Sequence, residues 1–168
     1  MRATIQLLPF FIIFHSSLVY SLPLSLPQGK LVLPQGETLI TYLAISLQEK
    51  SRGLSGIKDK QMKVNEALFF YYPQRGERLF WMVDTYIDLD IFFLDKNLKV
   101  IKIYRKMKAH PGRNVPPFIQ STANEISTHV LELRSDSKLS QKIKRGDVLR
   151  WSPAFPLSQK ELNTRLRQ

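Results

Sequence analysis

The chain alternates short apolar segments with clusters of turn-forming residues. Within these segments, β-branched and aromatic side chains are frequent and several positions alternate between apolar and polar, which is typical of β-strands. The segments that show this pattern are 38–46, 67–72, 78–83, 89–94, 98–104, 126–133 and 148–151.

Two of the turns between these segments predict hairpins. Pro73-Gln74-Arg75-Gly76 has the composition of a β-turn and would join 67–72 to 78–83, and Asp95-Lys96-Asn97 would join 89–94 to 98–104. Residues 105–125 contain three prolines and a glycine, so we expect a long loop there.

Helix signals are few and local. Ser46 and Ser158 each precede a glutamate by three residues, which is the spacing of a capping box. The first helix would end at Gly53, a second short helix is expected at 137–143, and the tail 153–168 would form a short helix if it docks. Many short strands with brief helices predict a mainly β fold, a single compact antiparallel β-barrel or sandwich-like domain with one to three short helices.

The amino-terminal residues have the pattern of an export signal. Residues 1–21 contain an apolar stretch that ends in Val19-Tyr20-Ser21, so we expect a cleaved signal peptide, with an uncleaved membrane anchor as the alternative. Residues 22–37 would then be a Pro-rich leader, 38–152 the domain and 153–168 the tail. The mature chain would be periplasmic or extracellular and would have no transmembrane segment.

The amino-acid composition excludes several kinds of functional site. The chain has no cysteine, which excludes disulfides, thiolate catalysis and cysteine-ligated metal sites. Its three histidines are far apart in sequence, so we expect neither a metal site nor a cofactor. Phosphate-binding glycine loops and G-x-S-x-G elbows are also missing from the sequence.

A net charge of +11 points to anionic partners. Cations concentrate in the predicted strand and loop at 96–108, where the expected basic surface contains Lys99, Lys102, Arg105, Lys106 and Lys108. Export disfavours nucleic acid, so anionic lipid or an acidic envelope polysaccharide is the better candidate partner. The alternative is a solvated face that only aids solubility.

Several motifs, in order and spacing, resemble the DUF192 (UPF0127) family. The resemblance implies a compact, mostly β fold that is often exported and has no established activity. Val83 and Asp84 stand where the family usually has lysine and asparagine. The resemblance covers about 39–151 and rests on Arg52-Gly53-Leu54, Ala67-Leu68-Phe69, Phe80-Trp81-Met82, Thr85, Leu89-Asp90-Ile91, Val130-Leu131-Glu132, Ile143, Gly146 and Asp147.

Four aspartates interrupt the apolar stretch 80–95. We interpret Asp84 and Asp95 as turn residues and place Asp88 at the rim. Asp90 lies among apolar residues, where a carboxylate needs a cation or several donors. Either it is a structural tie, to backbone amides or to an arginine such as Arg52, or it belongs to a site.

The site hypothesis places Asp90 beside Glu132. The candidate pocket contains Arg52, Trp81, Thr85, Asp90 and Glu132, with Trp81 as an aromatic wall. It predicts a non-enzymatic envelope binding or accessory module whose ligand the sequence does not identify. The alternative is a hydrolase that uses the two carboxylates as a pair.

Overall fold

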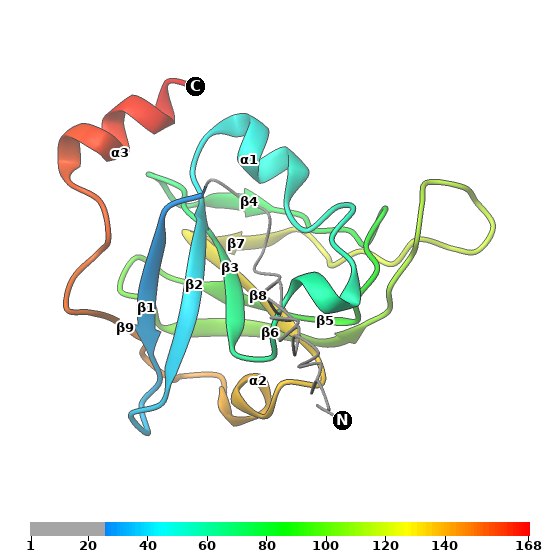
Figure 1. The fold of residues 1–168 in the computed structure, drawn as a ribbon, viewed down its shortest axis with the longest axis horizontal. Coiled ribbons are helices and arrows are strands. Elements are labelled where there is room, and N and C mark those ends of the chain that lie inside the picture. Colours follow the sequence, from blue (N-terminus) through cyan, green and yellow to red (C-terminus); the bar gives the residue numbers. More distant parts are fainter. Residues whose placement is uncertain (1–25) are drawn as a thin grey trace, which may run out of the picture.

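The computed structural model describes residues 26–168, and the predicted signal peptide lies outside them. Nine strands and a few short helices form the described domain (Figure 1). The strands are β1 Gln28–Val32, β2 Thr38–Ala44, β3 Glu66–Phe70, β4 Gly76–Arg78, β5 Leu89–Leu94, β6 Val100–Met107, β7 Glu125–Ser127, β8 His129–Arg134 and β9 Arg150–Ser152. The helices are α1 Leu47–Arg52, the 3-10 turn η1 Asp59–Gln61, α2 Lys138–Lys142 and α3 Gln159–Leu166.

Seven strands form one sheet in the order β6-β5-β8-β3-β2-β1-β9, and β4 pairs with β7 in a small second sheet. Every paired neighbour is antiparallel except β2 and β3, which run parallel and are joined through α1 and η1. The mainly β prediction is therefore confirmed. The sheet does not close into a barrel, and it is mixed.

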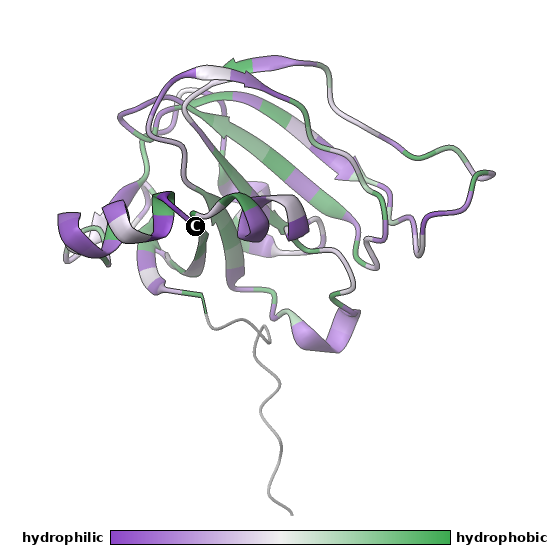
Figure 2. Cartoon of the chain, turned by 90° about the horizontal axis from the view of Figure 1, so that it is seen from above, coloured by the Kyte–Doolittle hydropathy of each residue, from purple (hydrophilic) through white to green (hydrophobic). Residues whose placement is uncertain are grey.

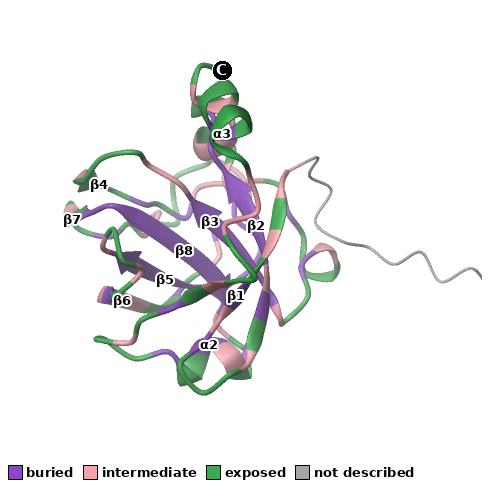
Figure 3. Ribbon diagram, turned by 90° about the vertical axis from the view of Figure 1, so that its left-hand side faces the viewer, coloured by how far each residue is buried: buried purple, intermediate pink, exposed green. Residues whose placement is uncertain are grey.

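Three neighbouring strands inside the sheet, β5, β8 and β3, are covered on both faces. Every residue of β3, β5 and β8 is buried, whereas α2 and α3 are largely exposed (Figure 3). One face packs Phe70, Ile91 and Val130 in one core, and the other packs Phe92 and Leu131 in a second core. In Figure 2 the helices are largely hydrophilic, whereas the hydrophobic residues are concentrated in the strands, which also carry hydrophilic positions. Apolar side chains from two faces therefore hold the fold together.

The hairpin between β5 and β6 is confirmed, but the one expected from 67–72 and 78–83 is wrong. β3 already pairs with β2 and β8, so it has no free edge for the segment that follows the turn. That segment instead forms β4 on β7 and two isolated bridges, Trp81 to Ser121 and Val83 to His110.

The sheet begins inside the segment expected to be a leader. The sequence Leu-Pro-Gln-Gly occurs at 26–29 and again at 33–36, and β1 begins within the first copy. The second copy forms the turn into β2, where the Gly36 amide donates to the Leu33 carbonyl. Gly36 has φ 96°, which a residue with a side chain rarely adopts.

All three helix starts follow the local signals. Ser46, Ser137 and Ser158 each accept a backbone amide with the side chain, and the boxes at Ser46 and Ser158 are complete. The tail helix α3 docks, because Leu162 is buried against Leu43 and Ile45.

Candidate functional site

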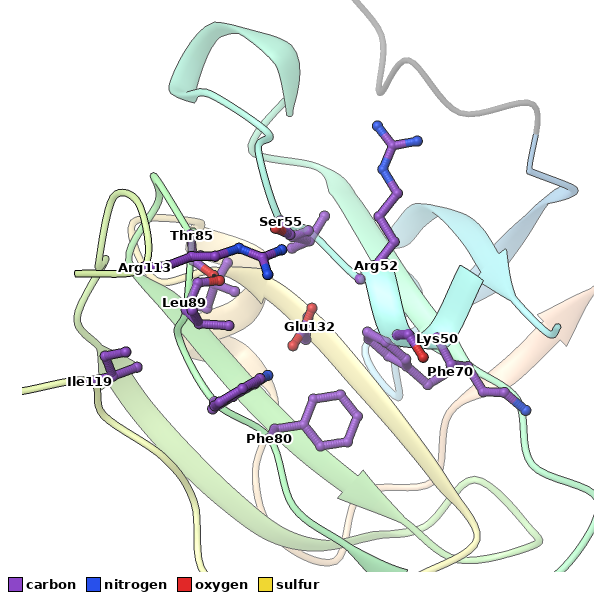
Figure 4. A pocket seen from close by; sticks show the side chains of 15 residues that line it. Lys50, Arg52, Ser55, Phe70, Phe80, Thr85, Leu89, Arg113, Ile119 and Glu132 are labelled. Atoms are coloured by element: carbon purple, nitrogen blue, oxygen red, sulfur yellow. Dashed lines mark hydrogen bonds between the residues drawn. The ribbon is translucent and has the colours of Figure 1, made fainter. Parts of the chain in front are cut away.

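A pocket of about 370 Å³ opens on one face of the sheet (Figure 4). Its walls come from the end of α1, the segment 80–85 and the loop that follows β6, and its floor comes from the sheet. Such a volume lies at the lower end of the range for small-molecule sites. The charged and aromatic side chains that line the pocket include Lys50, Arg52, Phe80, Trp81, Arg113 and Glu132.

Glu132 forms the floor from the middle of β8. Its neighbours across the sheet are Leu68 in β3 and Ile91 in β5, so both flanking side chains are apolar. Oε2 of Glu132 is buried and finds no hydrogen-bond partner among the described residues. Burial raises the pKa of Glu132 to about 8, so the group is a neutral acid at pH 7 and can donate a hydrogen bond.

Aromatic side chains form one wall. Phe80 contacts Phe70 edge-on, with ring centroids 4.7 Å apart, and its backbone amide donates to Thr122 Oγ1. Trp81 follows at the pocket, bridged to Ser121, and is 60% exposed. A largely exposed indole on a fixed backbone offers a flat apolar face to a ligand.

Arg113 reaches across the pocket from a loop that is fixed at its base. In Figure 4 its guanidinium extends toward the centre, where Glu132 lies. The His110 ring bridges the loop, with Nδ1 3.2 Å from the Gly112 carbonyl oxygen and Nε2 3.0 Å from that of Pro117. The Asp84 amide also donates to Gly112, over 2.7 Å.

Asp84 is the turn residue expected from sequence, with φ 53°. Its carboxylate accepts a hydrogen bond from Ser55 Oγ at 2.8 Å, which is the main cause of the lowered pKa of Asp84; Arg113 lowers it further. Asp95 also caps a turn, because its Oδ1 accepts the amides of Asn97 and Lys99.

Arg52 and Thr85 both line the pocket, but neither points a free polar group at its centre. Arg52 extends away from Glu132 in Figure 4. Thr85 is buried and its hydroxyl donates to the Val83 carbonyl. Lys50 lies at the edge, where Nζ donates to the Tyr71 carbonyl and burial lowers the pKa of its ammonium.

Asp90 is not in this pocket, which corrects the grouping expected from sequence. Its Oδ2 accepts Arg105 Nη1 at 2.7 Å and Ser140 Oγ at 2.6 Å, and its Oδ1 accepts the Lys106 amide at 2.8 Å. Asp90 is buried, so this is the structural tie. The partner is Arg105 rather than Arg52.

The same tie alters the expected basic surface. Arg105 also donates to the carbonyls of Ser140 and Ile143, so its guanidinium is paired with groups of the fold although the side chain is partly exposed. Lys102 lies 3.7 Å from Glu125, and Lys108 pairs with Asp88 at 2.7 Å. The exposed Lys99 and Lys106 complete the surface, which is therefore partly neutralised.

Sequence reasoning missed Arg113, Lys50 and Phe80 as pocket residues. Arg113 could have been noticed as one of two cations in a loop, 108–124, that contains no acid. Within residues 26–168, no three histidine or carboxylate side chains gather as a ligand set for a metal ion. In that same part of the chain, no helix has the length and apolar character needed to span a bilayer.

Chemically, the pocket combines one neutral acid with a positive rim. Three basic side chains and a single acid are found among the described lining residues. This arrangement attracts anions and offers hydrogen bonds to their oxygen atoms. It does not contain the two carboxylates that the hydrolase hypothesis needs.

The comparisons with known proteins agree with the fold. The DUF192 family model, described as "Uncharacterized ACR", matches residues 32–151 and confirms the resemblance of the motifs. A solved structure described as a candidate transcription regulator from Sinorhizobium meliloti 1021 is 22% identical, with a TM-score of 0.62 over 77% of this chain and 97% of that one. A protein of unknown function from Novosphingobium aromaticivorans DSM 12444 is 24% identical, with a TM-score of 0.59 over 77% and 89%. A comparison with curated proteins gave no match.

Proposed function

This chain belongs to the DUF192 family, and from its pocket we propose that it is an exported, non-enzymatic binding or accessory module of the cell envelope. The ligand in this proposal is an acidic group of sugar size, such as one unit of an acidic envelope polysaccharide. The envelope location rests on the predicted signal peptide at 1–21.

The observation that carries the proposal is the unpartnered acid of Glu132. A buried polar atom without a hydrogen bond costs about 1 to 3 kcal/mol, so a protein core seldom keeps one without a use. Because its pKa is about 8, Glu132 keeps its proton at pH 7, so it can donate a hydrogen bond to a ligand oxygen without repelling an anion.

The rim and the wall support the same ligand class. Arg113 extends over the pocket and can pair with a carboxylate, which a guanidinium binds in a bidentate manner. Trp81 presents an exposed indole against which the apolar face of a sugar ring can pack. Together the three groups would hold the charge, the ring and one polar oxygen of an acidic sugar.

A hydrolase that pairs Asp90 with Glu132 finds no support in this geometry. Paired carboxylates in glycoside hydrolysis flank one bond, about 5 to 9.5 Å apart. Here Asp90 is bound by Arg105 and Ser140 outside the pocket, so no second carboxylate lies beside Glu132 among the described lining residues.

Calorimetric titration with an acidic oligosaccharide, oligogalacturonate, and with a neutral oligogalactoside of equal length tests the proposal. We expect binding of the acidic chain alone. Arg113→Gln should weaken this binding about tenfold or more, because a charge-assisted hydrogen bond is lost. Arg145→Gln is the matched control, since it removes an exposed arginine that does not line the pocket.

The proton on Glu132 gives the second arm of the test. Binding to the wild type should fall as the pH rises through about 8, where the acid ionises and repels the ligand. Glu132→Gln keeps a donor and should bind with no such loss, whereas Glu132→Leu should bind poorly throughout. Equal binding of both oligosaccharides, or an unchanged affinity of Arg113→Gln for the acidic one, would contradict the proposal.

A further inference from the structure

The connection between β6 and β7 carries an exposed apolar tip. Phe118 is 80% exposed and Val115 is 68% exposed, with the exposed Pro116 and Pro117 between them. In Figure 1 this yellow-green connection projects from the body of the domain. A large aromatic side chain held in water at a projecting loop needs an explanation, because it loses the free energy of burial.

The tip is fixed in its exposed position. His110 is buried and its ring bridges the carbonyls of Gly112 and Pro117, which closes the base of the loop. Proline restricts φ at positions 116 and 117, so the segment has little freedom to fold Phe118 back onto the domain. Binding would thus cost little ordering entropy.

Cations flank the tip. The connection 108–124 contains Lys108 and Arg113 and no aspartate or glutamate, and the exposed Lys106 lies just before it. Lys108 pairs with Asp88 at 2.7 Å, so the positive charge beside the tip comes from Lys106 and Arg113. Apolar and aromatic side chains surrounded by lysine and arginine fit the boundary between the headgroups and acyl chains of an anionic bilayer. A projecting tip of a few residues suits this soft surface better than the flat, packed interface of a protein partner.

We propose that the loop tip formed by Val115 and Phe118, with its flanking cations, docks the domain on anionic lipid surfaces. Neither Val115 nor Phe118 lines the pocket, so substitutions at these two positions test this proposal separately from the acidic ligand. Arg113 and Ile119 of the same loop do line the pocket. Docking therefore holds the pocket mouth close to the lipid headgroups.

The absence of cysteine allows a direct test on the full chain. Phe118→Cys is labelled with the environment-sensitive dye NBD and mixed with vesicles of phosphatidylglycerol and phosphatidylcholine. We expect a blue shift and an increase in its emission, which pure phosphatidylcholine vesicles do not produce. Leu47→Cys is the control, because Leu47 is 73% exposed on α1, away from the loop.

Cosedimentation supplies the second measurement. Val115→Asp/Phe118→Asp should bind the anionic vesicles about tenfold less or weaker still, since the apolar contacts are lost. Leu47→Asp/Val64→Asp makes the same change of charge at exposed apolar positions elsewhere and should bind like the wild type. The variants keep residues 1–25 unchanged, so that segment contributes equally to all.

Emission from position 118 that stays solvent-like on anionic vesicles would overturn the proposal. An equal loss of binding in both double variants would do so too, because charge alone would then explain it. Binding of a soluble acidic polysaccharide by position 118, without any response to vesicles, would assign the tip to another partner and reject the lipid.

Discussion

Asp90 and Glu132 lie on neighbouring strands, but their carboxyl groups project from opposite faces of one sheet. Asp90 pairs in register with Leu133, and Glu132 pairs with Ile91. Residues paired across two strands project from the same face, and successive residues along one strand project from opposite faces. Asp90 therefore shares a face with Leu133, and Glu132 projects from the other face. The Asp90 carboxylate is bound by Arg105 and Ser140, whereas the Glu132 carboxyl faces the pocket.

Replacing Asp90 by asparagine should destabilise the domain. The change leaves the Arg105 guanidinium and Ser140 hydroxyl without their charged acceptor. A broken buried pair costs about 3 to 5 kcal/mol, and we expect about 2 to 4 because the Arg105 side chain is 36% exposed. Urea unfolding gives the free energy.

The matched control for this change is Asp95→Asn, which alters a turn carboxylate that is not buried. Removing Arg105 as well should recover part of the loss, which a double-mutant cycle measures. A wild-type unfolding free energy in Asp90→Asn would show that the tie contributes little.

Stability should fall as the pH rises from about 6.5 to 8, because of Glu132. Its pKa is raised from 4.5 to about 8, so the folded state keeps a proton that the unfolded chain releases. This contribution is present in full below 4.5 and is lost on the way to 8. Between 6.5 and 8 the loss is about 2 kcal/mol.

His129 changes the stability with pH in the opposite direction, at lower pH. Burial lowers its pKa from 6.5 to about 4, so its contribution is lost as the pH falls from 6.5 toward 4. Denaturant unfolding at several pH values measures both. Glu132→Gln should lack the decline above 6.5, and Glu77→Gln, at an exposed position, should retain it. A decline that persists in Glu132→Gln would place its origin elsewhere.

Truncating Leu162 should test the docking of α3. Leu162 is 6% exposed and packs on Leu43 and Ile45, so Leu162→Ala should cost about 2 to 3 kcal/mol in unfolding free energy. Leu47→Ala removes the same atoms from an exposed helical position and should change stability by about 0.5 kcal/mol or less. If both variants unfold alike, the tail is not part of the cooperative unit.

Processing of the amino terminus remains a prediction from the sequence. The apolar stretch ends at Val19-Tyr20-Ser21, so the protein recovered from the envelope should begin at or near Leu22. N-terminal sequencing measures this directly. Intact Met1 in the membrane fraction would instead indicate an anchor.

Local features could be predicted from the sequence because their partners are near in the chain. The cap of Ser46, the cap of Ser158 and the β5 to β6 hairpin each depend on residues a few positions apart. The insertion of β8 between β3 and β5 could not be predicted, since no local pattern encodes which distant strands pair.

The candidate site also has features that could be predicted from the sequence and features that could not. The alternation of side chains along a strand is enough to place Glu132 on the face opposite Leu131 and Leu133, which is where the structure has it. It could not relate Glu132 to Asp90, because that requires the register between two strands. The position of Arg113 depends on a loop whose path is set by contacts with His110 and Asp84, far from any periodic pattern.

The pocket takes its floor from a buried strand and its walls from connections that lie outside the large sheet. Glu132 is fixed by β8, whereas Trp81 and Arg113 come from 80–85 and the loop before β7. Within 80–85, Phe80 and Met82 belong to the core, whereas the wall residues Trp81 and Arg113 are exposed. Ligand selectivity should therefore be transferable by grafting the two wall segments between relatives, so that a chimera inherits a new specificity on an unchanged scaffold.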